Sequence, residues 1–262
     1  MSTPPDTLAR LLLEEHRTGA RYHPVAASHG IAAPNAAYAV QRAFVAAMME
    51  GRDDPPAGYK IGLTSKRMQE MCGIGSPVAG VVLPGRVHRS GVTLARGGYG
   101  RLGLEFEVGV QLARDVPHRA APYDAAAIAP YVGAVCAAVE IVDDRSADYK
   151  ELEALSLICD NAWNAGIVLG EARDTWPDLS GVVASVLWNG ERIDGGHGRD
   201  ALGHPFVPLA WLAGHLAESG MALRAGEWVL TGSIVTTRFP TAPAQVRFEV
   251  TGLDAVEIAV TD

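Results

Sequence analysis

Two different patterns of hydrophobic and polar positions divide this chain of 262 residues. The first fifty residues have helical spacing. Leu8, Leu11, Leu12 and Glu15 follow a Pro-Pro-Asp start, and a second apolar stripe runs through 35–50. The segment G-R-D-D-P-P-A-G, residues 51–58, then interrupts the pattern with turn-forming residues. We therefore predict a helical N-terminal region, residues 1–57, followed by a second region, residues 58–262.

The second region has short apolar runs separated by turn signals, which indicate strands. Asn189-Gly190 after one of these runs predicts a type I′ hairpin, and 205–219 has helical spacing. Taken together, the pattern predicts an α+β protein with a mostly antiparallel or mixed sheet system. The expected strands are 59–63, 92–94, 102–112, 132–142, 165–169, 182–188, 227–231, 245–250 and 255–260.

The run L-E-F-E-V-G-V, residues 104–110, places two acids in an apolar strand. Residues two apart in a strand point to the same face, so Glu105 and Glu107 are expected side by side, with Phe106 on the opposite face. Adjacent carboxylates repel one another unless solvent, a proton or a cation relieves them. One interpretation is a solvent-exposed face, as in many antiparallel sheets. The other is a cation site.

A third acid, Glu140, stands alone in the apolar run A-A-V-E-I-V, which favours the cation site. A buried carboxylate is costly unless it is paired or ligated. Three glutamates from two strands offer the all-oxygen ligands that Mg²⁺ or Mn²⁺ prefers. The alternative for Glu140 is an ion pair with the nearby Arg145.

Lys60 is a second candidate for chemistry. In G-Y-K-I-G-L-T-S it lies between apolar neighbours and two glycines. Apolar surroundings lower the pKa of a lysine and make it a usable acid or base. A strand lysine whose ammonium reaches solvent is the alternative.

Composition and charge exclude several classes of protein. The net charge of −8, without a cluster of basic residues, argues against binding to nucleic acid. The N-terminal segment has no basic leader and no long apolar run, so we expect neither a signal peptide nor a membrane span. We therefore expect a cytoplasmic protein. The three cysteines, Cys72, Cys136 and Cys159, are far apart and are expected to be reduced and buried.

The ordered set of motifs resembles one family. It comprises G-Y-K-I-G-L-T-S-K-R-M-Q, E-F-E, V-E-I-V-D-D-R, D-N-A-W-N-A-G-I-V-L-G, L-G-H-P and L-T-G-S. In this order they resemble the 2-keto-4-pentenoate hydratase / 4-oxalocrotonate decarboxylase group of the fumarylacetoacetate hydrolase superfamily. The resemblance covers nearly the whole chain, from the second helix onward.

The resemblance implies a mixed β-sandwich roll, here the catalytic domain 58–262, preceded by helices. It implies Mg²⁺ or Mn²⁺ bound by Glu105, Glu107 and Glu140, with Lys60 in proton transfer. It also places Val78, Asn164 and Ser233 at the substrate. The implied substrates are small 2-oxo or 2-hydroxydienoate acids from the degradation of aromatic compounds. A cation on the C1 carboxylate and C2 oxygen would stabilise the enolate as a Lewis acid.

The motifs differ in the reaction they favour. N-A-W-N-A-G-I-V-L-G is closer to the hydratases, with Asp143, Asp144 and Asn164 available to orient water. Val78, where hydratases typically carry an acid, is closer to the decarboxylases, and Gly103 replaces a basic residue that many relatives have. We favour addition of water to a 2-hydroxy-2,4-dienoate to give a 4-hydroxy-2-oxo acid, with 4-oxalocrotonate-type decarboxylation as the alternative.

Two further alternatives rank below these. C–C hydrolysis is third, because S-L-I-C-D lacks the lysine that hydrolases carry before the aspartate. A partner subunit with a weak site is the other alternative, and the intact Lys60 and three glutamates argue against it. The resemblance further implies a homo-oligomer that can associate with a paralogous decarboxylase or hydratase.

Overall fold

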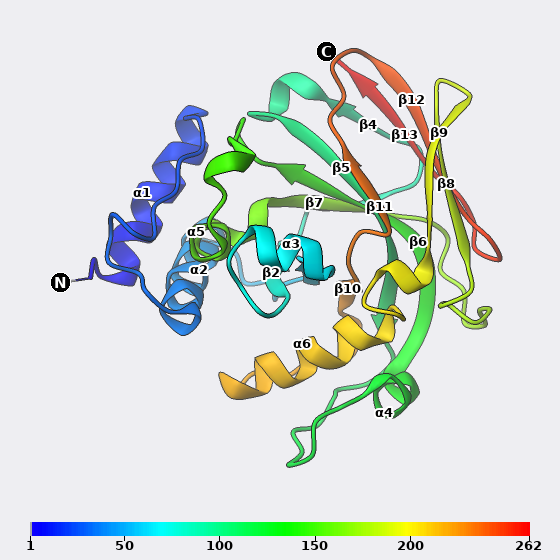
Figure 1. Ribbon diagram of the computed structural model, residues 1–262, viewed down its shortest axis with the longest axis horizontal. Coiled ribbons are helices and arrows are strands. Elements are labelled where there is room, and N and C mark those ends of the chain that lie inside the picture. The colour runs from blue at the N-terminus through cyan, green and yellow to red at the C-terminus, as the bar shows by residue number, and fades with distance from the viewer. Residues whose placement is uncertain (1) are drawn as a thin grey trace.

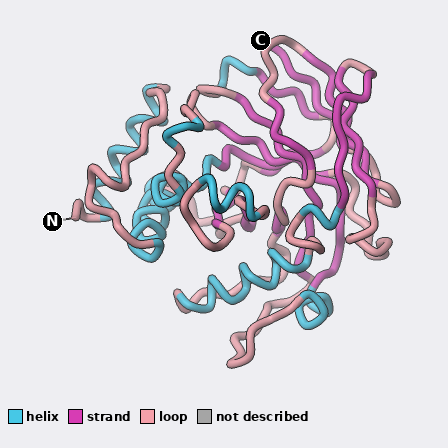
Figure 2. Tube along the Cα trace, viewed as in Figure 1, coloured by secondary structure: helices cyan, strands magenta, loops and turns pink. Residues whose placement is uncertain are grey.

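The structure of the protein is a computed structural model that describes residues 2–262. The N-terminal helices lie at the left of the view, most strands lie at the upper right, and later helices lie below (Figures 1 and 2). The helices are α1 (Pro5–Thr18), α2 (Pro34–Met48), α3 (Lys66–Met71), α4 (Ala125–Ile128), α5 (Ala154–Cys159) and α6 (Phe206–Glu218). The strands are β1 (Gly58–Gly62), β2 (Val78–Val82), β3 (Val87–Arg89), β4 (Val92–Ala95), β5 (Leu102–Leu112), β6 (Val132–Asp143), β7 (Asn164–Leu169), β8 (Val183–Trp188), β9 (Glu191–His197), β10 (Trp228–Leu230), β11 (Val235–Arg238), β12 (Ala244–Val250) and β13 (Val256–Thr261).

The strands form two mixed sheets. The larger has the order β2-β1-β10-β5-β6-β7-β3, and β11 also pairs with β5. The smaller has the order β4-β13-β12-β8-β9. The rings of Phe106 on β5 and Phe248 on β12 pack with their centroids 5.2 Å apart, so the two sheets share a core. The expected α+β fold, a β-roll preceded by helices, is confirmed.

The N-terminal helices pack into the same core as the sheets. Helix α1 begins with proline in its first turn and ends at Gly19, whose φ of 67° is the left-handed conformation that glycine adopts readily. Its Leu8 and Leu12 are buried in one cluster with Phe44 of α2 and Leu104 of β5. Because this core is continuous, the helices are well placed to contribute to a site on the sheet. The boundary at residue 57 stays a prediction.

All of the expected strands are present, and four further ones were not predicted. The hairpin between β8 and β9 turns at Asn189 and Gly190, both with positive φ, as expected for a type I′ turn. The strands that the pattern missed are β2, β3, β9 and β11. They are short or rich in glycine and polar residues, and β2 is completed by pairing with β1. Within residues 2–262, no helix combines the length and the apolar character needed to cross a membrane.

Candidate metal centre and active site

Three glutamates meet where β5 and β6 pair. The strands are antiparallel, and their register sets Glu105 directly opposite Glu140. Glu107 follows two residues along β5 and shares the face of Glu105. One carboxylate oxygen from each residue lies within 4.8 Å of the others. Glu107 and Glu140 are fully buried, so the alternative of a solvent-exposed glutamate face is wrong.

Each glutamate is held by a protein donor. Glu107 Oε2 accepts from the backbone N–H of Gly232 at 2.6 Å, and Glu105 Oε1 accepts from the hydroxyl of Thr237 at 2.8 Å. Glu140 Oε1 accepts from the side-chain amide of Asn164 at 2.9 Å. These donors orient the carboxylates from outside the cluster, as outer partners of metal ligands do.

The opposite oxygens of the two buried glutamates have no such donor. Glu107 Oε1 and Glu140 Oε2 are buried, and nothing in the described residues hydrogen-bonds to either. A buried carboxylate oxygen without a partner is costly. A hard divalent cation relieves that cost and takes oxygen ligands of this kind. The residues therefore fit a cation bound between Glu105, Glu107 and Glu140.

The electrostatics of the cluster agree with this fit. Burial raises the pKa of Glu107 well above its ordinary value, and the charges of Glu140 and Glu105 add to the rise. Burial also raises the pKa of Glu140 to about 7, although the charge of Lys60 opposes the shift. A raised pKa means that the ionised form of the carboxylate is destabilised, and a bound cation stabilises that form.

Lys60 on β1 reaches into the same cluster. Its Nζ lies 3.1 Å from Glu140 Oε1, and its side chain is 5 % exposed. Gly62 and Gly80 flank the lysine; a methyl group on Gly80 would stand 3.2 Å from Lys60 Cγ. Glycine at these positions leaves room for the lysine stem beside the glutamates.

The predicted lowering of the Lys60 pKa is wrong. Burial acts to lower it, but the charges of Glu140, Glu105 and Glu107 together raise it above the ordinary value. The alternative of a lysine reaching solvent is also wrong, because Lys60 is buried. The residue is therefore an ammonium ion held by carboxylates.

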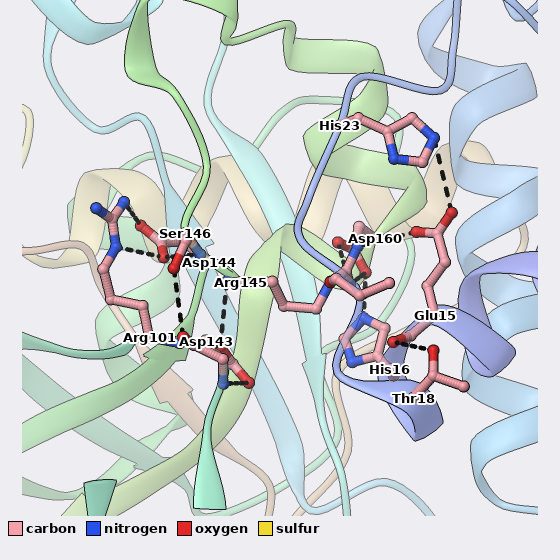
Figure 3. A network of polar contacts seen from close by, with 12 residues as sticks. Glu15, His16, Thr18, His23, Arg101, Asp143, Asp144, Arg145, Ser146 and Asp160 are labelled. Carbon is pink, nitrogen blue, oxygen red and sulfur yellow. Dashed lines mark hydrogen bonds and ion pairs between the residues drawn. The ribbon is translucent and has the colours of Figure 1, made fainter. Parts of the chain in front are cut away.

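Arg145 does not pair with Glu140, so the alternative ion pair is wrong as well. Its guanidinium contacts Asp160 at 2.9 Å and Glu15 at 3.1 Å instead (Figure 3). The backbone turns with positive φ at Arg145 itself, directly after β6, and so carries the side chain toward helix α1. Glu140 therefore contacts Lys60 and Asn164 and lies in the glutamate cluster.

A cavity of about 580 Å³ opens in front of Lys60 and Glu105. Ser233 lies on its wall, and apolar side chains form much of the remainder, among them Met68, Leu152, Leu157 and Ile234. A short acid of the expected class fits such a space, with its polar end at the glutamates and its other end among apolar groups.

The three expected substrate contacts have different positions. Ser233 lines the cavity, and its hydroxyl accepts from the backbone N–H of Phe106 at 3.1 Å. Asn164 lies behind Glu140 and lines a neighbouring cavity. Val78 is fully buried beside Gly62 and is not one of the described residues that line the cavity at Lys60. Their roles toward substrate stay predictions.

Asp143 and Asp144 bind groups outside the glutamate cluster. Asp143 accepts from the backbone N–H groups of Gly100 and Arg101, at 3.0 Å each. Asp144 is buried and pairs with the guanidinium of Arg101 (Figure 3). Both aspartates therefore hold the turn after β6, and a role in orienting water stays a prediction.

Two groups that support the site were missed from the sequence. The first is Thr237, which no motif marks. The second is the backbone N–H of Gly232, with φ 103°; a side chain there would collide with Thr64. The motif L-T-G-S contains this glycine, so the conformation that it requires was the one available signal.

The chain resembles known proteins over nearly its whole length. The family model "Fumarylacetoacetate (FAA) hydrolase C-terminal" matches residues 38–261. A 2-keto-4-pentenoate hydratase 2 of Dechloromonas aromatica is 31% identical over 88% of this chain and 87% of its own. A 2-oxo-hept-4-ene-1,7-dioate hydratase of Escherichia coli is 33% identical over 75% of each chain. The structure of 4-oxalocrotonate decarboxylase from Pseudomonas putida G7, complexed with magnesium and adipate, has a TM-score of 0.90 at 22% identity, covering 99% of this chain and 100% of that one.

Proposed function

We propose that this chain, which belongs to the fumarylacetoacetate hydrolase family, is a metal-dependent hydro-lyase. It adds water to a 2-hydroxy-2,4-dienoate and gives a 4-hydroxy-2-oxo acid, as part of the degradation of aromatic compounds. The observation that carries the proposal is the cluster of three glutamates with two unpartnered buried oxygens, beside a buried lysine. The relatives named as hydratases support the same reaction.

The glutamates would hold Mg²⁺ or Mn²⁺. Such an ion, when bound, supplies Lewis-acid stabilisation for the negative charge that develops on the oxygen at C2 of the acid. Glu105, on the wall of the cavity, presents the site to the substrate, and Glu107 and Glu140 lie behind it. Gly232, Thr237 and Asn164 keep the three carboxylates in place.

Lys60 transfers the protons. The dienol loses its proton from the C2 hydroxyl and gains one at C5, which leaves a double bond between C3 and C4. Water then adds its oxygen to C4 and a proton reaches C3, so the sum is substrate plus one water. Lys60 Nζ enters as an ammonium ion and donates at carbon. It gives up this proton more readily when a dication shares the glutamates, because like charges repel.

The cavity wall orients the substrate. Ser233 is proposed to contact the acid directly from that wall. Asn164 is proposed to act at the polar end, through its hydrogen bond to Glu140. Val78 is proposed to keep the region behind Gly62, a residue of the cavity wall, apolar. These roles belong to the proposal.

Decarboxylation of a 4-oxalocrotonate-type 2-oxo acid is the second candidate. The largely apolar wall of the cavity and the apolar residue Val78 favour it. Departure of CO₂ from a substrate carboxylate is easier in a dry pocket. Water addition also requires that a water molecule reach C4 between those apolar side chains.

The test offers both substrates to the purified protein with Mg²⁺ and, separately, with Mn²⁺. We expect 4-hydroxy-2-oxopentanoate from 2-hydroxypenta-2,4-dienoate and loss of this activity in EDTA. Release of CO₂ from 4-oxalocrotonate, without hydration of the dienoate, would show the chain to be a decarboxylase. Absence of both reactions would favour a partner subunit.

The proposal also includes a cytoplasmic homo-oligomer that can associate with a paralogous decarboxylase or hydratase. The three cysteines are free and buried, which suits a reducing compartment. Size measurement of the protein alone, and after mixing with such a paralogue, tests the assembly.

A further inference from the structure

A strained turn leads directly to the residue that holds Glu140. Asn161, Ala162 and Trp163 have φ values of 49°, 49° and 60°, three consecutive non-glycine residues in the left-handed region. This conformation costs roughly 1–2 kcal/mol per residue and persists where surrounding contacts impose it. Asn164 follows at once, and its amide donates to Glu140. The contacts that impose the turn therefore also place Asn164.

One set of these contacts comes from strand β2. The side chain of Asn161 accepts from the N–H of Val81 at 2.7 Å and donates to its carbonyl at 2.8 Å. The carbonyl of Asn161 lies so close to Gly80 that a methyl group there would stand 2.7 Å from it. The turn is thus fixed on one side by the larger sheet.

The other contacts come from Asp160, the residue before the turn. The residue is 1 % exposed, and its carboxylate accepts from Arg145 Nη1 at 2.9 Å and from His16 Nε2 at 2.6 Å. Arg145 follows β6, whereas His16 lies near the end of helix α1 and points toward Asp160 (Figure 3). Arg145 also donates to Glu15, the neighbour of His16 on that helix. The N-terminal helix therefore ends against the residue that opens the strained turn.

We infer that His16 is a positioning residue for the metal site. It fixes Asp160, and through the turn 161–163 it keeps the amide of Asn164 on Glu140. The inference rests on the metal site of the proposed function, and it extends the site into the helical N-terminal region. Ala162 and Trp163 of the same turn form part of the active-site cavity, so the turn also shapes the wall that faces the substrate.

A purely structural role for His16 gives a different expectation. If the contact with Asp160 does no more than fasten α1 to the sheet, its loss lowers the free energy of unfolding and leaves the cation affinity of the folded protein unchanged. If His16 positions Asn164, its loss weakens binding of the cation in protein that is still folded. Cation affinity therefore separates the two roles, whatever reaction the enzyme catalyses.

The experiment measures Mn²⁺ affinity of the full chain by electron paramagnetic resonance of free Mn²⁺, together with thermal unfolding. Asn164→Ala is expected to weaken binding by about 10–100-fold, the usual effect of removing an outer partner of a metal ligand. His16→Ala is expected to weaken it by a smaller factor. The double variant should bind no more weakly than Asn164→Ala alone, because both changes act on the same contact.

Two further variants serve as controls. His16→Gln offers an amide N–H in place of the imidazole N–H and is expected to restore the affinity to within about twofold, the scatter expected for unrelated changes. Arg17→Ala alters the same end of α1 but removes a residue paired with exposed Glu14, so wild-type affinity is expected.

Several results would overturn the inference. Affinity in His16→Ala equal to that of the wild type would leave His16 a structural role alone. So would an unchanged affinity in Asn164→Ala, or full additivity in the double variant, because each removes the route through Asn164. A wild-type protein that binds no Mn²⁺ would overturn the metal site and this inference together. Normal wild-type binding with unchanged variants would overturn this inference and leave the proposed function standing.

Discussion

Lys60 and Glu140 form a buried ion pair, with Nζ 3.1 Å from Oε1, although the two residues lie on strands that are not neighbours in the sheet. Strands β10 and β5 separate β1 from β6 in the larger sheet. Both side chains therefore reach across the same face to meet. The pair brings the proposed proton carrier into contact with a proposed metal ligand.

Replacement of Lys60 by alanine should lower turnover by about 10²–10⁴-fold, the usual contribution of a positioned acid or base. Mn²⁺ binding should change far less, because the lysine is not a ligand and its loss also removes a repelling charge. Steady-state kinetics and a Mn²⁺ titration of the same preparation check both parts. Lys66→Ala, on exposed α3, is the matched control and should keep its activity. A Lys60→Ala enzyme with most of its activity would contradict the assigned role.

Replacement of Glu107 by glutamine should have opposite effects on function and on stability. Gln keeps an oxygen that accepts from Gly232 but removes a buried charge whose pKa is raised well above its ordinary value. Metal binding and activity should fall. Without metal, the free energy of unfolding of the variant should exceed that of the wild type by on the order of 1 kcal/mol at neutral to alkaline pH. Chemical denaturation in EDTA measures this.

Glu249→Gln is the control for Glu107→Gln, because Glu249 is a carboxylate in an exposed ion pair with Arg247. Exposed pairs contribute little, so neither stability nor metal affinity should change noticeably. If the metal-free Glu107→Gln protein were less stable than the wild type, the carboxylate would be acting as a structural acceptor and not as a strained metal ligand.

The metal-free protein should lose stability as the pH rises from about 4.5 to above 7. Glu140 has a pKa of about 7 in the folded protein against an ordinary value of 4.5, and that of Glu107 is raised too. Between these values the folded state binds more protons than the unfolded state. The free energy of unfolding is therefore highest below the unfolded pKa and falls as pH rises through the folded pKa. Denaturation at several pH values in EDTA measures the trend.

Saturating Mn²⁺ should remove or reverse that fall, because the cation binds the ionised carboxylates of the folded state. The same linkage predicts that cation affinity rises with pH through about 7. A stability profile that is equally flat with and without Mn²⁺ would show that the glutamates do not titrate in this range.

Replacement of Gly80 by alanine should destabilise the protein by about 1–3 kcal/mol, the usual cost of overpacking. The added methyl group would stand 2.7 Å from the carbonyl of Asn161 and 3.2 Å from Lys60 Cγ. Activity should also fall, because the strained turn and the lysine both have to move. Gly97→Ala is the control: of the described residues, none other than its chain neighbours comes within 4 Å of the added atom. Equal stability of the two variants, measured by thermal unfolding, would contradict the packing argument.

The sequence predicted those parts of the site that depend on local pattern. Strands β5 and β6 follow the alternation closely, so the shared face of Glu105 and Glu107 was correct. The isolated acid in an apolar run identified Glu140 for the same reason. A carboxylate in such a run is costly to bury unless it is paired or ligated, so the run alone indicates a partner.

What the sequence did not predict depends on partners far along the chain. Arg145 appeared available to Glu140, but helix α1 supplies Glu15 as its partner, 130 residues away. The direction of the Lys60 pKa was wrong because three carboxylates around one ammonium outweigh its burial. Short strands such as β2 and β11 form because β1 and β5 pair with them, and their own residues carry little signal.

The length of the β5–β6 ladder has a consequence for insertions and deletions in the gene. The two strands pair from Leu102–Asp143 to Leu112–Val132, and the side-chain period of a strand is two. Loss of Gly103 would turn the side chains that precede Glu105 to the opposite faces of the strand. Loss of Phe106 would instead send Glu105 and Glu107 to opposite faces. The first part of the connection between the strands, 113–124, precedes α4 and contains no helix or strand, so a change of length there causes no such inversion. Single-codon deletion of Phe106 should therefore abolish metal binding, whereas single-codon deletions within 113–124, between the end of β5 and α4, should retain it.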